Sequence, residues 1–359
     1  MGGHPHHTAG TRILFPFRAK KIPPAFGNAA AIAPVLATRG REPRHQKEHR
    51  TTMTDTTPRG SDRRHFLKCM TWAGTAMVWT VAGGVPRSRL IGSAEAATGF
   101  NFVQISDSHL GFDKSANPNT TATLQEALKD VAALPGSPAF MIHTGDITHL
   151  SKPAQFDTAR QLLGDTKMTT CTVPGEHDIL EDDGKSYLNH FGKGSRGDGW
   201  YSFDAGGVHF IAMVNVVNLK GNGLGDFGHE QLEWLEHDVK GLSASTPIVV
   251  FAHVPLWIAY KPWGWGTADG AQALSYLKRF GSVTILNGHI HQVLQKVERH
   301  VAFHTARSTA FPQPAPGTAP SPGPMKVPAG ELRHYLGVAQ ISLVSSHAPL
   351  AIVDTPLAG

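Results

Sequence analysis

The chain has 359 residues and a formal net charge of +5, a length that suits one large domain or two small ones. Residues 1–96 hold 15 Lys and Arg against 5 Asp and Glu, a net of +10, whereas residues 97–359 hold 18 against 23, a net of −5. Since the longer part is acidic, the overall charge is no reason to expect a nucleic-acid polymer as a partner.

The first notable pattern along the chain is that of an export signal. Residues 63–68 (RRHFLK) resemble the twin-arginine consensus, and a weakly apolar run follows from Met70 to about Val85. Residues 94–96 (AEA) then match an A-x-A cleavage site. We therefore expect residues 53–96 to be a twin-arginine signal peptide. This predicts the twin-arginine export machinery as a partner and a periplasmic or secreted location.

Residues 1–52 have no helical or strand period and are rich in Arg, His and Pro. Because Met53 begins an ordinary signal sequence, we expect residues 1–52 to be an untranslated or disordered extension. Cys69 precedes the apolar run, a position that does not suit a lipid anchor, so no stable membrane anchor is expected. Cleavage after Ala96 would leave Cys171 as one thiol, which excludes an intramolecular disulfide in the mature chain.

The first half of the remaining chain alternates short apolar runs with helical patterns. Apolar runs predict strands, and apolar residues at a spacing of three and four predict helices. The predicted order is strand 100–106, helix 120–134, strand 139–143, helix 153–164 and strand 169–173. This alternation is typical of a layered α/β domain, in which ligands bind just beyond the carboxyl ends of the strands.

The second half continues as a mixture of strands and helices. The predicted elements are strands 200–204 and 208–214, helix 228–240, strand 247–252, helix 270–279, strand 283–286, a hairpin of 293–297 and 301–305, and strand 336–343. Residues 312–328 contain seven prolines, which predicts a loop. We expect a single domain over residues 97–359 with this Pro-rich insertion.

Five groups of metal-binding residue types each follow a predicted strand. They are Asp107-Ser108-His109, Gly145-Asp146, Gly175-Glu176-His177-Asp178, His253-Val254-Pro255 and Gly288-His289-Ile290-His291. Carboxylates mixed with imidazoles suit two divalent ions such as Mn, Fe, Zn or Co. Asp146 is placed to bridge them, because each carboxylate oxygen can take one ion.

The order of these groups resembles the signature of the calcineurin-like metallophosphoesterases, and residues 103–109 resemble the class III cyclic-nucleotide phosphodiesterases of that superfamily. The resemblance implies a four-layer α/β/β/α sandwich with a dinuclear metal centre at the sheet edge. It assigns the first ion to Asp107, His109, Asp146 and His291, and the second to Asp146, Glu176, His253 and His289.

Glu176 departs from the family motif, which has Asn before the His. With Asp107, Asp146 and Glu176 as ligands, the protein would supply a charge of −3 against +4 for two divalent ions. We therefore expect phosphate to be attracted less strongly, and bound water to be less acidic, than in the usual site. The alternative is that Glu176 points away and the second ion is weakly held.

The resemblance implies cleavage of a small phosphate ester, a phosphodiester or a phosphomonoester, by a hydroxide held between two metal ions. It gives His177 the role of protonating the leaving oxygen, and we expect Asp178 to orient His177. Alternatives are a phosphatase with monoester preference and a non-catalytic metal-binding protein of the same fold, for which Glu176 is the support. A single-metal hydrolase of a non-phosphate ester is disfavoured because both ligand sets are complete apart from the Glu substitution.

The aromatic segment Trp257–Trp265 follows the His253 group directly along the chain. It forms either a wall of the substrate pocket, where rings would stack on a base or pack an acyl chain, or part of the core.

Overall fold

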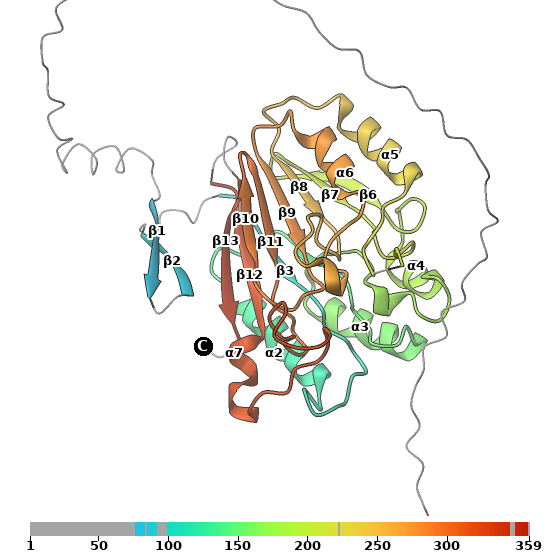
Figure 1. Cartoon of the computed structure of the whole chain (residues 1–359), viewed down its shortest axis with the longest axis vertical. Helices are drawn as coiled ribbons and strands as arrows, with labels where there is room; N and C mark the ends of the chain where they lie inside the picture. The colour runs from blue at the N-terminus through green and yellow to red at the C-terminus, as the bar shows by residue number, and fades with distance from the viewer. Residues whose placement is uncertain (1–75, 83–84, 92–98, 222, 345–348, 358–359) are drawn as a thin grey trace, which may run out of the picture. The chain divides into compact units, whose positions relative to one another are not determined.

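This computed structural model describes residues 76–82, 85–91, 99–221, 223–344 and 349–357 (Figure 1). The predicted extension 1–52 and most of the predicted signal peptide 53–96 lie outside the described residues. Within the latter, β1 (Ala76–Ala82) and β2 (Val85–Ile91) pair as an antiparallel hairpin. No described helix is both long and apolar enough to cross a membrane.

One of the two larger sheets contains the first three strands that the sequence predicts after the signal. These are β3 (Asn101–Ile105), β4 (Met141–His143) and β5 (Thr170–Thr172), which run parallel to one another. β12 (Gly337–Ser342) pairs antiparallel with β3, and β13 (Ala351–Pro356) pairs antiparallel with β12. The strand order is β13-β12-β3-β4-β5.

The other sheet is built from the middle of the chain in the order β10-β11-β9-β8-β7-β6. Its central strands β7, β8, β9 and β11 are parallel, and its two edge strands are antiparallel to their neighbours. The strands are β6 (Tyr201–Ala205), β7 (Val208–Ala212), β8 (Ile248–Phe251), β9 (Val283–Asn287), β10 (Gln295–Glu298) and β11 (Val301–Thr305). The predicted hairpin is thus confirmed as β10–β11.

The two sheets pack face to face through an apolar layer. In β8, Val249 and Phe251 belong to this layer, whereas Ile248 and Val250 belong to the cluster on the helical side. Both faces of such a strand are buried, which is why its sequence is continuously apolar and does not alternate. Phe102 of β3 meets the Phe210 ring of β7 edge-on, with centroids 5.1 Å apart.

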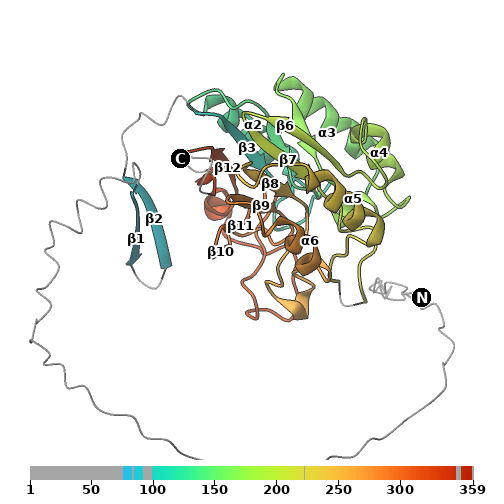
Figure 2. The same cartoon turned by 90° about the horizontal axis from the view of Figure 1, so that it is seen from above.

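Helices cover the outer face of each sheet (Figures 1 and 2). On the five-stranded sheet these are α2 (Thr120–Ala133), α3 (Pro153–Asp165) and α4 (Lys185–Phe191). On the six-stranded sheet they are α5 (His229–Lys240) and α6 (Gly270–Leu277). The layers therefore follow the order α/β/β/α, as the resemblance implies.

Short helical turns complete the described elements. They are η2 (Glu176–Asp178), η3 (Lys261–Trp263), η4 (Ala329–Glu331) and α7 (Leu332–Tyr335). The Pro-rich residues 312–328 connect β11 to η4 without helix or strand, which agrees with the predicted loop.

A buried histidine ties the edge of the six-stranded sheet to α5. His209 Nδ1 lies 2.8 Å from Asp204 Oδ1 and its Nε2 lies 2.9 Å from Asp238 Oδ2. Burial lowers the pKa of His209, but the two carboxylates outweigh burial and the pKa is raised. The pair of bonds therefore favours the protonated ring in the folded protein.

We predict that His209→Gln destabilises the protein in a pH-dependent way. A raised folded pKa gives stability that is fully present below the unfolded pKa of about 6.5 and is lost as the pH rises through the folded value. The free energy of unfolding should fall by about 1 kcal/mol at pH 6, and by less at pH 9, in urea denaturation. His229→Gln, on the exposed surface of α5, is the control; an equal loss for His209→Gln at both pH values would contradict the prediction.

Candidate metal centre

The five predicted groups lie together at one end of the two packed sheets. Three of them follow β3, β4 and β5 in one sheet, and two follow β8 and β9 in the other. Because the carboxyl ends of these strands meet at the same edge, residues up to 184 positions apart in the sequence become neighbours, as Asp107 and His291 do. All seven predicted metal ligands take part in this arrangement.

The first set of donor atoms surrounds the end of β3. Asp107 Oδ1 lies 3.3 Å from His291 Nε2, and His291 Nε2 lies 3.2 Å from His109 Nε2. His109 Nε2 is also 3.5 Å from Asp146 Oδ2. One carboxylate oxygen and two imidazole nitrogens therefore converge beside Asp146, in an arrangement that can hold one divalent ion.

The second set is built around Glu176. Its Oε2 lies 2.9 Å from His253 Nε2, and its Oε1 lies 2.9 Å from His289 Nδ1. Glu176 Oε2, His253 Nε2 and His289 Nδ1 are buried atoms that make no hydrogen bond. Glu176 thus points into the centre, and its carboxylate and the two imidazoles converge closely enough to share a cation.

Asp146 lies between the two sets. Its Oδ2 is 3.4 Å from His253 Nε2 and 3.5 Å from His109 Nε2, while its Oδ1 accepts a hydrogen bond from the backbone N–H of His177 at 2.9 Å. Oδ1 thus contacts the backbone of η2, and the prediction that each oxygen takes one ion stays a prediction, since a carboxylate oxygen with one hydrogen bond keeps a second lone pair. The single Oδ2 faces both sets.

Backbone carbonyls fix the orientation of two of the imidazoles. His253 Nδ1 donates to the carbonyl oxygen of Thr144 at 2.7 Å, and His291 Nδ1 donates to that of Phe311 at 2.5 Å. Since a carbonyl can only accept, each Nδ1 carries a hydrogen, and in the neutral ring each Nε2 has a lone pair directed at the centre. Partners of this kind orient ligands and raise their basicity.

Most of the predicted ligands have a left-handed backbone. The residues and φ angles are Asp107 (53°), His109 (41°), Asp146 (50°), His289 (72°) and His291 (53°). For residues other than glycine this conformation costs about 1–2 kcal/mol each, and it clusters at functional sites. Gly288 is required for close approach, since a Cβ there would lie 2.1 Å from Ser106 Oγ.

Asp107, Glu176 and His253 are held in their charged forms by their neighbours. Burial raises the pKa of Asp107 and of Glu176, but neighbouring histidines outweigh burial, so both values are lowered. Burial lowers the pKa of His253, yet Asp146 and Glu176 raise it well above its usual value. A bound cation would replace the proton on such a histidine, so metal binding should release protons.

Asp178 does not orient the ring of His177, which corrects the sequence prediction. Its oxygens accept hydrogen bonds from the backbone N–H groups of Ile147, Thr148 and Gly175 and from the Thr148 hydroxyl, at 2.8–3.0 Å. The His177 ring instead donates from Nδ1 to the carbonyl oxygen of His149 at 2.7 Å. Asp178 therefore ties the loop after β4 to the loop after β5.

We predict that Asp178→Ala lowers the free energy of unfolding by about 2–4 kcal/mol, because three backbone N–H groups lose a buried, charged acceptor. Urea denaturation with a metal chelator present would measure this without a contribution from bound metal. Exposed Asp198→Ala is the control, and Asp178→Asn, which keeps one acceptor oxygen, should lose less. A loss no larger than that of the control would contradict the assignment.

His177 is half-buried and lies beside both sets of donors. With Nδ1 bound to a carbonyl, its Nε2 is the nitrogen able to give or take a proton. Burial lowers its pKa, but the carboxylates of Asp146 and Glu176 outweigh burial and raise it. These carboxylates favour the protonated form that a general acid requires.

The aromatic segment divides between core and surface. Trp265 is fully buried, and Trp257 packs in the core under the six-stranded sheet, against Phe303. Tyr260 and Trp263 are partly exposed and meet edge-on, with centroids 5.2 Å apart. Core packing therefore explains Trp257 and Trp265, and a pocket wall would be limited to the other two.

Three known proteins have sequences similar to parts of this chain. Purple acid phosphatase 15 of Arabidopsis thaliana is 28% identical over 138 residues, which are 35% of this chain and 25% of that protein. Purple acid phosphatase 23 of the same plant is 33% identical over 102 residues, which are 26% of this chain and 21% of that protein. The chain thus spans a quarter or less of these plant relatives. A protein named "probable cyclic nucleotide phosphodiesterase" from Synechococcus is 25% identical over 223 residues, covering 60% of this chain and 83% of that protein.

Two solved structures share the fold. A dimetal phosphatase from Danio rerio matches with a TM-score of 0.55 at 16% identity, over 72% of this chain and 96% of that one. The purple acid phosphatase PPD1 from yellow lupin matches with a TM-score of 0.52 at 13% identity, over 72% and 52%. Residues 100–293, more than half of the chain, match the calcineurin-like phosphoesterases. The chain belongs to this family.

Proposed function

We propose that the chain is a phosphodiesterase that works with two divalent cations. The observation that carries the proposal is the convergence of two donor sets on Asp146 Oδ2, with buried donor atoms of Glu176, His253 and His289 that make no hydrogen bond. The first ion would be held by Asp107, His109, Asp146 and His291. The second would be held by Asp146, Glu176, His253 and His289.

When bound, the cations would supply positive charge for phosphate oxygens and lower the pKa of a water molecule. The protein's own contribution is to orient and to move a proton. In the hydrolysis of a diester, an oxygen of water bonds to phosphorus while the bond from phosphorus to the leaving oxygen breaks. His177 Nε2 gives its proton to that oxygen. The attacking water releases one proton, which replaces the proton that His177 has lost.

Glu176 tunes this centre through its charge. With two divalent cations bound, three carboxylate ligands leave a smaller net positive charge at the centre than two carboxylates and an Asn would. A phosphodiester carries one negative charge and a phosphomonoester up to two, so a less positive centre disfavours the monoester more strongly. The orientation of Glu176 toward His253 and His289 supports a diester preference.

The likeness to the Synechococcus protein supports the same preference, because it covers most of that protein. The matches to purple acid phosphatases are shorter but favour phosphomonoesters. A monoester phosphatase is therefore the second candidate.

The proposal is tested by metal content and turnover of the full chain loaded with Mn. Elemental analysis should give two ions per chain, and bis-p-nitrophenyl phosphate should be hydrolysed with a higher kcat/KM than p-nitrophenyl phosphate. Two ions with the reverse preference would make the protein a monoester phosphatase. One ion or none, without turnover, would overturn the dinuclear mechanism.

We also propose export by the twin-arginine route, on the basis of residues 63–68, the apolar run and the cleavage pattern at 94–96. When the full chain is expressed in a bacterium with this route, the protein recovered from the periplasm should begin near Ala97. Replacing Arg63 and Arg64 together by Lys should keep the chain in the cytoplasm, and unchanged export would contradict the proposal.

A further inference from the structure

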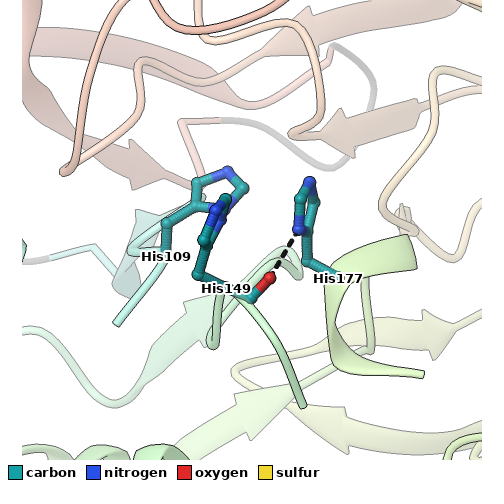
Figure 3. Close-up of side chains that lie close together, drawn as sticks. All are labelled: His109, His149 and His177. Carbon is teal, nitrogen blue, oxygen red and sulfur yellow. Dashed lines mark hydrogen bonds between the residues drawn. The ribbon is translucent and has the colours of Figure 1, made fainter. Parts of the chain in front are cut away.

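His149 lies within the centre although it belongs to none of the five predicted groups (Figure 3). It follows Asp146 by three positions, in the loop after β4, and is half-buried. Its ring stacks on that of His177, with centroids 4.8 Å apart and 17° between the planes. The Phe112 ring meets His149 edge-on at 5.0 Å. Packing therefore holds the imidazole of His149 against that of His177.

The main chain of His149 holds the same neighbour. Its carbonyl oxygen accepts the hydrogen bond from His177 Nδ1 at 2.7 Å, which Figure 3 shows as a dashed line. One residue thus fixes both the plane of the His177 ring, by stacking, and its rotation within that plane, by the hydrogen bond. Nε2 is left as the nitrogen that exchanges protons.

The side chain of His149 also reaches the first donor set. Its Nδ1 lies 3.3 Å from His109 Nδ1, while His109 Nε2 faces His291 and Asp146. If His109 binds an ion through Nε2, its Nδ1 carries the hydrogen and can donate it to the lone pair of His149 Nδ1. Such a bond would fix the tautomer in which His109 is a ligand.

We propose that His149 is a positioning residue that serves both functions of the centre: its ring aligns the proton donor His177, and its Nδ1 holds the ligand His109. The inference rests on the proposed function. The ring nitrogens of these three histidines lie close enough to hold an ion of their own. His149 Nδ1, however, lies 3.3 Å from Nδ1 of His109, which is not the nitrogen that faces His291 and Asp146, so the geometry points to positioning.

Two substitutions separate the two functions. His149→Phe keeps a planar ring that can stack between Phe112 and His177 but has no nitrogen. His149→Asn loses the ring but can place its amide oxygen near the position of Nδ1. Exposed His237→Asn on α5 is the control. Each full-length variant would be checked for folding by its melting temperature and compared with the wild type.

The readouts are the apparent Kd for Mn and the dependence of kcat on the leaving group. The latter uses a series with p-nitrophenyl, p-chlorophenyl and phenyl leaving groups, in the ester class that the wild type hydrolyses. His149→Phe should weaken Mn binding about 10–100-fold and leave the leaving-group dependence unchanged. His149→Asn should keep Mn binding, and should slow the phenyl substrate by about 10-fold or more relative to the p-nitrophenyl substrate, which needs little proton donation.

A single common loss of rate for all substrates with unchanged Mn affinity would show a merely structural role and overturn the inference. So would wild-type behaviour of both variants, or a third ion per chain that is lost in His149→Phe. If the wild type hydrolyses no substrate, the proposed function fails; the Mn affinities of the two variants then still decide whether His149 holds His109.

Discussion

Asp146→Asn should lower kcat/KM by at least about 10³-fold and leave less than two ions per chain. Asp146 Oδ2 lies 3.5 Å from His109 Nε2 and 3.4 Å from His253 Nε2, so its charge acts on both proposed ions. The amide of Asn is neutral and cannot neutralise two cations. Its remaining oxygen can still accept the His177 N–H, so the fold should persist.

The measurement combines steady-state rates with elemental analysis over a series of Mn concentrations. Asp157→Asn is the matched control, because that carboxylate is exposed on α3 and pairs with His190. If the ions are held as proposed, excess Mn should restore metal content more fully than it restores rate. Full activity in Asp146→Asn at low Mn would show that this carboxylate does not bridge.

His177→Gln should lower kcat for substrates with a poor leaving group by about 10²–10⁴-fold, the usual contribution of a general acid. The rate for bis-p-nitrophenyl phosphate should fall much less, because nitrophenolate leaves without needing a proton. His177 is not among the seven proposed ligands, so the metal content should stay at the wild-type level.

The leaving-group comparison distinguishes proton donation from other roles of His177. His237→Gln, exposed on α5, controls for the loss of an imidazole. An equal fall for good and poor leaving groups would indicate that His177 binds the phosphate and does not protonate the leaving oxygen. A loss of one ion would indicate that it is a ligand.

Much of the fold could be predicted because the central strands are short, continuously apolar and each followed by polar residues. β3, β4, β5, β8 and β9 all begin and end within two residues of the predicted runs. α4 and β13 were missed. α4 has seven residues between glycines, and β13 is an edge strand whose pairing with β12 depends on a neighbour that the local sequence does not reveal.

The predicted ligand residues are brought together because the strand-end rule places them at one edge. Their supporting contacts could not be predicted. The carbonyl oxygen of Phe311 that holds His291, and that of Thr144 that holds His253, are backbone atoms that carry no residue-specific signal. Asp178 was misassigned because adjacency to His177 suggested contact, whereas η2 directs its carboxylate toward other loops. The sequence offers one indication that His149 lies near the centre, namely its position three residues after Asp146.

The left-handed backbone at five of the seven proposed ligands has a consequence for folding stability. Glycine has no Cβ and adopts this conformation without the steric penalty that applies to Asp and His. The backbone conformation alone would favour glycine at Asp107, His109, Asp146, His289 and His291. The backbone strain at these five positions is therefore a cost in folding stability that comes with placing their donor atoms at the centre.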